Sequence, residues 1–408
     1  MMRERQVRMK MRLNVTGMLV ALVVIATLAC SPQMILGEWV GGKATGTPTK
    51  FAQAANTPVS SSTLISPIPT ATFSPSLTPT PGITNTPSPV LALRTDLPSL
   101  TLRDWPRPAN DNGRCIHFLP TGYYSQRDFD IQIPRMVDLQ MRWVLALYAD
   151  ENQLRLAARN FKAAGIVPIW RKTLDANQRY YGWGRDVQIL TEVGLPPYFQ
   201  IYNEPDTDHE WNGSEVNREQ WVAYFVQMAK DVYNAGGFVG LQTLDEEWIR
   251  TVLQAIKAYK GERMTSRMFF IPHPYGLNHP PNYIEDDNGV LGWRGAAEVF
   301  QQELGFVPPF IAGEGGWKFA AGEDNRFPSI DNKLHAQYHV ELFRWFVDGK
   351  VSDSKALPDY FFAFCPWILA GQLEGAAWYD SFEGERTQTI ADIKKIPIVT
   401  RKFSWDKK

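Results

Sequence analysis

Short apolar runs alternate with longer amphipathic stretches from about residue 100 to the end of the chain. A short apolar run bounded by turn residues is typical of a buried strand, and apolar residues spaced three and four apart are typical of a helix with one packed face. The pattern therefore predicts a repeated strand–helix unit. The predicted strands are 115–119, 143–148, 166–170, 198–202, 238–241, 268–271, 310–312 and 360–369, the last favoured over a shorter alternative at 375–379.

Helix start signals separate these strands. Asp128 follows Ser125 by three residues and Gln153 follows Asp150 by three, a spacing at which side chains satisfy free N–H groups of a first helical turn. Parallel strands need a long crossover between them, and helices supply it. The longer predicted helices are 215–235, 246–259 and 331–347, with a final helix near 387–396.

Eight strand–helix units in residues 100–408 predict an α/β fold, an eight-stranded parallel β/α (TIM) barrel. The alternative is a doubly wound open sheet, which a glycine-rich phosphate loop after the first strand would favour. Leu119-Pro120-Thr121-Gly122 is not such a loop. The pattern therefore favours a barrel, in which the functional residues come from the carboxyl ends of the strands.

The first 30 residues predict a targeting segment. Residues 3–12 are basic, residues 13–29 are almost wholly apolar, and Cys30 follows them. This order is typical of an export signal or a short membrane anchor. The end of the run resembles a bacterial lipoprotein signal, whose cysteine is lipidated, although Thr27 stands where such signals usually place leucine. We expect residues 1–30 to be a signal peptide or a membrane or lipid anchor.

Residues 31–99 predict a disordered linker. The part from 44 to 90 is rich in proline, threonine and serine, and Lys50 is its only charged residue. Such a composition cannot bury enough apolar surface to offset the entropy of ordering, so we expect an extended tether. The folded domain would then lie outside the cytoplasm, either secreted or held to the cell envelope by the N-terminal segment.

Charge and cysteine content limit the remaining functions. The 42 Lys and Arg residues balance 43 Asp and Glu residues, so we expect no nucleic-acid partner. Three cysteines are too few for a four-cysteine zinc site. Cys115 and Cys365 fall on the neighbouring first and eighth strands, where we expect buried thiols because disulfide geometry is demanding. We expect a monomer that needs no cofactor.

Two glutamates stand at the ends of predicted strands. Glu204 follows the fourth strand within Asn203-Glu204-Pro205, and Glu314 follows the seventh strand ahead of two glycines. Side chains alternate along a strand, so inward-pointing glutamates place Ile201 and Ile311 outward, toward the helices. Two carboxyl groups that face each other across a pocket are what cleavage of a glycosidic bond requires.

The sequence resembles the clan A glycoside hydrolases, retaining β/α-barrel enzymes that include the cellulase-like families. One departure is the end of the second strand, where many of these enzymes carry an arginine and this chain has Leu147-Tyr148-Ala149-Asp150. Arg171, after the third strand, is a candidate substitute. The matching motifs are Asn203-Glu204-Pro205, His273-Pro274-Tyr275, Glu314 and Trp367, at the ends of strands four, six, seven and eight.

The resemblance implies a role for each matching residue. Glu204 is the implied acid/base and Glu314 the implied nucleophile, with Asn203 bound to the sugar 2-hydroxyl. Tyr275 would donate a hydrogen bond to the nucleophile, and Trp367 would stack under the scissile sugar. Further predicted substrate-binding residues at strand ends and in the following loops are His273, Arg171, Trp170, Trp317 and Trp378.

These residues predict a retaining glycosidase that acts on a poly- or oligosaccharide. The resemblance implies that the linkage is β. One alternative is a non-catalytic carbohydrate-binding barrel on the cell surface, which the absent strand-two arginine favours. Another is a metal-dependent barrel hydrolase. His335 and His339, four apart on a helix, are a candidate metal pair, but no third ligand is evident and none of the six histidines adjoins either glutamate in sequence, so we expect no metal site.

Overall fold

A computed structural model describes residues 92–285 and 289–406 of the chain. The predicted targeting segment and the predicted linker up to residue 91 lie outside these ranges. Within them, no helix combines the length and apolarity needed to cross a membrane. Residues 92–97 lie against the barrel, where the backbone N–H of Arg94 donates to the Asn234 side chain at 2.8 Å and Arg263 donates to the carbonyl of Leu97 at 2.8 Å.

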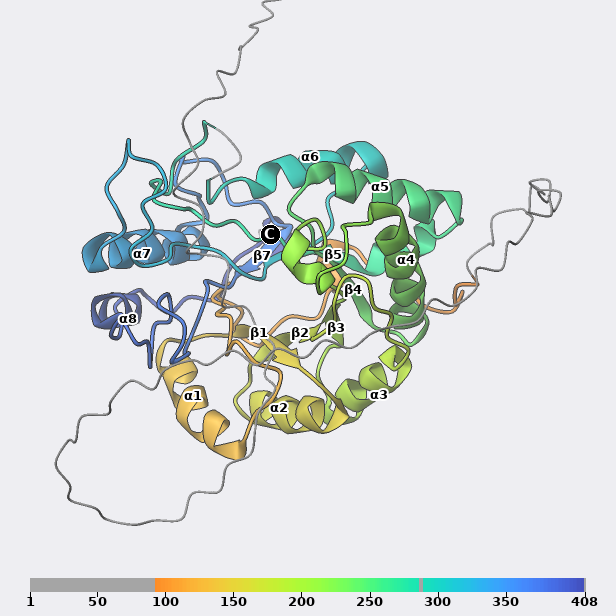
Figure 1. Ribbon diagram of the computed structural model, residues 1–408, viewed down its shortest axis with the longest axis horizontal. Coiled ribbons are helices and arrows are strands. Elements are labelled where there is room, and N and C mark those ends of the chain that lie inside the picture. The colour runs from red at the N-terminus through yellow and green to blue at the C-terminus, as the bar shows by residue number, and fades with distance from the viewer. Residues whose placement is uncertain (1–91, 286–288, 407–408) are drawn as a thin grey trace, which may run out of the picture. The chain divides into compact units, whose positions relative to one another are not determined.

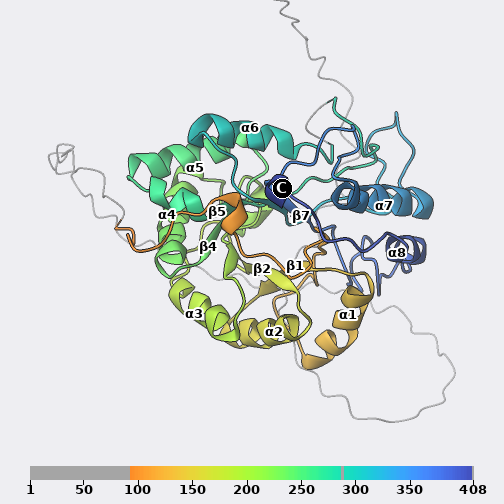
Figure 2. The same cartoon turned by 180° about the vertical axis from the view of Figure 1, so that it is seen from behind.

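The architecture is a parallel β/α barrel. Each strand pairs in parallel with the next one along the chain, so the order within the sheet is the order in sequence. In both views the helices lie around the outside of the strands (Figures 1 and 2). The strands are β1 (Trp143–Tyr148), β2 (Val167–Lys172), β3 (Tyr198–Gln200), β4 (Phe238–Leu241), β5 (Met268–Phe270), β6 (Phe310–Ala312) and β7 (Phe361–Phe364).

The predicted helices are confirmed, with ends shifted by a few residues. The start signals act as expected, since Asp128 and Ser125 cap one helix reciprocally and Asp150 accepts the N–H of Gln153. The helices are α1 (Gln126–Asp138), α2 (Glu151–Ala163), α3 (Trp183–Val193), α4 (Arg218–Asn234), α5 (Glu246–Ala258), α6 (Trp293–Leu304), α7 (Asn332–Asp348) and α8 (Thr387–Lys394), with short 3-10 turns at η1 (Leu102–Asp104), η2 (Asp208–Trp211), η3 (Glu262–Arg267) and η4 (Ser404–Asp406).

The described residues form seven strands, so the predicted count of eight is wrong. The segment predicted as the first strand, 115–119, pairs only at isolated positions. Its neighbour Arg114 bridges to Phe364 of β7, and His117 bridges to Leu145 of β1. Its backbone hydrogen bonds run to both neighbours, since the N–H of Cys115 donates to the carbonyl of Phe364 and the N–H of Leu145 donates to the carbonyl of Ile116. The segment therefore lies between β7 and β1 and nearly closes the ring, although it is too irregular to count as a strand. The favoured position for the last strand is confirmed, since β7 lies within 360–369.

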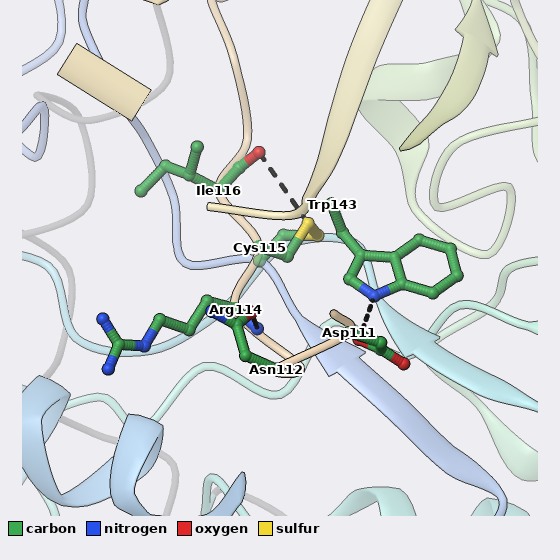
Figure 3. Close-up of a disulfide and its surroundings, with 7 residues drawn as sticks. Asp111, Asn112, Arg114, Cys115, Ile116 and Trp143 are labelled. Atoms are coloured by element: carbon green, nitrogen blue, oxygen red, sulfur yellow. Dashed lines mark hydrogen bonds between the residues drawn. A yellow bond between two sulfur atoms is a disulfide. The ribbon is translucent and has the colours of Figure 1, made fainter. Parts of the chain in front are cut away.

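A disulfide joins Cys115 to Cys365, with 4.2 Å between the two Cα atoms. The prediction of buried free thiols is therefore wrong, because the register between the two segments, in which the Cys115 N–H donates to the carbonyl of Phe364, places the cysteines side by side. Figure 3 shows the bridge beside Trp143, whose indole N–H donates to Asp111 at 2.8 Å. We refer to residues 115–119 as the closing segment. The disulfide thus links the closing segment to the residue that follows β7.

Two buried clusters show which way the strand side chains point. One cluster contains alternate strand residues such as Leu145, Ile169 and Ile311 and no residue of the eight α-helices, so it fills the barrel interior. The other cluster contains Ile201 and many helix residues, so it lies between the sheet and the helices. Ile201 therefore points outward as predicted, whereas Ile311 points inward, opposite to the prediction.

Candidate active site

Glu204 lies at the mouth of the barrel, four residues after the end of β3. Its backbone has a positive φ of 30°, a left-handed conformation that is strained for a residue with a side chain. The side chain of Gln242, after β4, accepts its backbone N–H and holds this turn. The Glu204 carboxylate lies 2.8 Å from Nδ1 of His273, and its side chain is 14% exposed. The strained turn thus presents a largely buried carboxyl group to the mouth.

Glu314 lies deeper, two residues after the end of β6, and is buried. Gly315 and Gly316 follow it with φ values of 138° and 75°. A Cβ on Gly315 would lie 2.6 Å from the carbonyl oxygen of Pro274, so the close approach requires glycine. Because β6 ends at Ala312, the alternation of a strand does not extend to Glu314, and both Ile311 and Glu314 point inward.

The two glutamates face each other at short range. One carboxylate oxygen from Glu204, one from Glu314 and a ring nitrogen of His273 all lie within 4.8 Å of one another. Retaining glycosidases hold their two carboxyl groups about 5–5.5 Å apart, whereas inverting enzymes separate them by about 6.5–9.5 Å to admit a water molecule. An oxygen–oxygen distance of at most 4.8 Å lies nearer the shorter of these two spacings.

Polar neighbours keep Glu314 ionised. The Tyr275 hydroxyl donates to Glu314 Oε2 at 2.9 Å, and Arg171 donates to Oε1. Burial alone would raise the pKa of Glu314, but His273, Arg171 and the Tyr275 hydroxyl lower it to about 2. Burial also holds the pKa of His117 well below its usual range, so this imidazole is neutral at neutral pH. Arg171 is therefore the permanent positive charge beside Glu314.

Arg171 lies within β2, because this strand extends two residues beyond the predicted end. It shares the face of Val167 and Ile169, so its side chain points into the barrel. Besides Glu314 it contacts Asn203, donating to the amide oxygen at 2.6 Å. Arg171 of β2 thus contacts the Glu314 carboxylate and links it to Asn203.

His117 and Trp367 complete the wall around Glu314. His117 Nε2 lies 3.7 Å from Glu314 Oε1, and its ring centroid lies 4.3 Å from that of Trp367. Trp367 is partly exposed, as stacking on a ligand requires, and the peptide bond that follows it is cis. Sequence reasoning missed His117, because a lone histidine on an irregular closing segment carries no motif.

The other predicted aromatic residues do not line the site. The indoles of Trp170, Trp317 and Trp378 are fully buried, which leaves no free face for a sugar and corrects the prediction for all three. Trp317 donates its indole N–H to the carbonyl of His279 at 2.8 Å. Position at a strand end does not decide exposure, because a loop can fold back over the side chain.

The histidines that lie near the glutamates are not the helical pair considered from the sequence. Three of them surround the two glutamates in space, since His117 contacts Glu314, His273 contacts Glu204, and His209 Nε2 lies 3.5 Å from Glu204 Oε2. The helical pair is structural: His335 is bonded to Thr389 at 2.7 Å, and His339 to the carbonyl of His335 at 2.8 Å. The argument that no histidine adjoins the glutamates holds along the chain but fails in space.

A cavity of about 690 Å³ opens beside Glu204. Its lining includes His273 and Tyr275 together with Trp248 of α5 and Trp293 of α6. Glu314 and Trp367 do not line it, so it extends from the Glu204 side of the glutamate pair. Its volume falls in the range of small-molecule sites.

Comparisons with known proteins find similar structures only at low identity. No family model matches the chain, and no curated protein matches it. A β-glucuronidase from Ruminococcus gnavus in complex with D-glucuronic acid aligns at 10% identity and a TM-score of 0.36, over 69% of this chain and 48% of the other. This chain therefore spans about half the length of that enzyme.

Two further structures align at comparable similarity. A family 39 glycoside hydrolase from Bacteroides cellulosilyticus WH2 shows 10% identity and a TM-score of 0.40, over 71% of this chain and 64% of the other. A D-psicose 3-epimerase from Clostridium cellulolyticum H10 shows 9% identity and a TM-score of 0.38, over 69% and 96%. Similarity at this level assigns neither a family nor an activity, and any function must be argued from the site.

Proposed function

We propose that this chain is a retaining glycoside hydrolase that cleaves β-linked poly- or oligosaccharides. The observation that carries the proposal is the approach of the Glu204 and Glu314 carboxylates to within 4.8 Å, with different surroundings. Glu314 is buried beside Arg171 and Tyr275, as a nucleophile that must be ionised requires. Glu204 borders the cavity where a leaving group would lie, as an acid/base requires.

The reaction would proceed in two displacements. Glu314 attacks the anomeric carbon while Glu204 donates its proton to the departing glycosidic oxygen, giving a glycosyl ester. Glu204 then removes a proton from water, which attacks the same carbon and releases Glu314. In this proposal Asn203, which accepts a hydrogen bond from Arg171, binds the sugar 2-hydroxyl, and Trp367, which packs on His117, supports the sugar ring.

Trapping the ester tests the assignment. A 2-fluoro glycoside with a good leaving group should label Glu314, because the fluorine slows hydrolysis of the ester more than its formation. The Glu314→Gly variant should be inactive and regain turnover with azide, giving a glycosyl azide of inverted configuration. A label on another residue would move the nucleophile, and inverted product from the unmodified enzyme would exclude the retaining mechanism.

The same assays separate the proposal from its alternatives. A non-catalytic binding barrel would take up oligosaccharide without turning over any aryl glycoside. A metal-dependent hydrolase would lose activity with a chelator. The Arg171 guanidinium bonded to Glu314 disfavours that alternative, because it occupies the carboxylate that a catalytic metal would need.

We also propose that the chain is exported and acts as a monomer outside the cytoplasm. The Cys115–Cys365 disulfide supports export, because disulfides persist in oxidising compartments and are rare in the cytosol of most organisms. Fractionation of cells that produce the full-length chain should find it in the envelope or the medium. Recovery in the cytoplasm with free thiols would contradict this part of the proposal.

A further inference from the structure

A second group of polar side chains lies just outside the glutamate pair. His209 and Glu210 belong to η2, in the loop that follows β3, and Glu204 lies five residues before His209. His209 Nε2 is 3.5 Å from Glu204 Oε2 and 3.6 Å from Glu210 Oε1. We refer to Glu204, His209 and Glu210 as the outer triad. One oxygen or nitrogen from each member lies within 4.8 Å of the other two.

These separations fit a four-coordinate zinc ion. Zn²⁺ binds imidazole nitrogen and carboxylate oxygen at about 2.0–2.2 Å, so two ligand atoms at tetrahedral positions lie about 3.3–3.6 Å apart. The two distances from His209 already fall in this range. The third distance, between the carboxylate oxygens of Glu204 and Glu210, must shorten by at most about 1.5 Å, which rotation of a side chain provides.

The surroundings of the triad favour a cation there. Asn203 donates to Glu210 Oε1 at 2.6 Å and fixes this carboxylate beside His209. Among the described residues, Glu204 and Glu210 form ion pairs only with histidines and with no lysine or arginine. The His209 side chain is 57% exposed, which leaves a path from solvent and room for water as the fourth ligand.

The neighbouring combination of Glu204, His273 and Glu314 is a poorer metal site, although its atoms are equally close. Arg171 is bonded to Glu314, and its positive charge opposes a second cation. His273 Nδ1 is held 2.8 Å from Glu204, a hydrogen-bond distance shorter than a tetrahedral ligand edge. The outer triad, on the solvent side of Glu204, is therefore the more favourable of the two metal sites.

We propose that the outer triad is a Zn²⁺ site and that its occupation inhibits the enzyme. An imidazole ligand favours Zn²⁺ over Mg²⁺ or Ca²⁺, which prefer oxygen alone. Zinc bound to Glu204 Oε2 takes the place of the proton that this residue delivers to the leaving group. Inhibition rests on the proposed glycosidase function, whereas zinc binding does not.

Calorimetric titration of the full-length chain with ZnCl₂ at pH 7 tests the site without relying on activity. We expect one saturable site that His209→Gln or Glu210→Gln weakens at least 100-fold, because loss of an outer-shell partner alone costs about 10–100-fold. Asp208→Asn is the matched control: it removes one charge from the same loop, at an exposed residue outside the triad, and should change affinity less than threefold.

Co²⁺ supplies a spectroscopic check on the coordination. The unmodified chain should give the visible ligand-field bands of four-coordinate Co²⁺, and His209→Gln should lose them. Unchanged Zn²⁺ affinity in His209→Gln, an Asp208→Asn effect equal to that of Glu210→Gln, or absence of saturable binding would each overturn the site.

Inhibition is measured separately, as oligosaccharide hydrolysis with and without Zn²⁺. The Zn²⁺ concentration at half inhibition should equal the dissociation constant from calorimetry. In His209→Gln, addition of Zn²⁺ should no longer change the rate of hydrolysis. Zinc binding without any hydrolysis would keep the site and remove the proposed function. Hydrolysis that persists at saturating zinc would remove the inhibitory role alone.

Discussion

Arg171→Met offers a sharp test of how the proposed nucleophile stays ionised. Methionine keeps much of the length and apolar stem of arginine and removes its charge. Glu314 remains buried in the variant, so the burial that opposes ionisation is retained while the permanent cation is lost. The variant therefore isolates the electrostatic contribution of one contact.

The size of the effect follows from the geometry. Two unit charges in contact, about 4 Å apart between their centres, interact by about 4 kcal/mol at an effective dielectric constant of 20. This energy corresponds to about three pKa units at about 1.4 kcal/mol each. Loss of Arg171 should therefore raise the pKa of Glu314 from about 2 to about 5 or above.

The pH dependence of kcat/KM for an aryl glycoside reports this change. The acid limb should move up by about three pH units in Arg171→Met, because a larger fraction of Glu314 is protonated at each acidic pH. Arg171→Lys should restore most of the original limb, since it restores the charge. Arg155→Met removes a surface arginine paired with Glu192 and should leave the profile unchanged.

An acid limb that stays in place in Arg171→Met would refute the reasoning. Ionisation of Glu314 would then have to rest on His273 and the Tyr275 hydroxyl. A uniform loss of activity at every pH would instead show that Arg171 acts by holding Asn203 and the sugar, with no effect on the pKa of Glu314.

Two further predictions concern the acid/base and the disulfide. Glu204→Gln should abolish hydrolysis of glycosides with poor leaving groups but spare the first step for activated aryl glycosides. The measurement is kcat/KM for a series of substrates, plotted against the pKa of the leaving group. Equal losses for the two kinds of substrate would contradict the assignment. Replacing both Cys115 and Cys365 by Ala should lower the free energy of unfolding by about 5 kcal/mol in urea, because the bridge closes a chain segment of 250 residues. A loss below about 1 kcal/mol would show that the closing segment is held without the bridge.

The sequence by itself determined the elements and the two glutamates. Regular alternation of apolar runs and capped helices requires a parallel sheet wrapped by helices, and strand ends in such a fold meet at one face. Glu204 and Glu314 follow strands β3 and β6, so their meeting was implied by the order of the elements alone. The hydrogen bond from Tyr275 to Glu314 agrees with what the family resemblance implied, whereas the contact of His273 with Glu204 is seen only in the structure.

Tertiary structure decided the contacts that no period or motif encodes. Because β6 ends at Ala312, the alternation of a strand does not extend to Glu314, and the disulfide was set by the register between the closing segment and β7. Loops folded over Trp170, Trp317 and Trp378, so residues that looked available are buried. The histidines around the glutamates come from separate segments, and only packing brings them together. Short-range patterns predict which segments form strands and helices, whereas the exposure and partners of a side chain depend on residues far away in the chain.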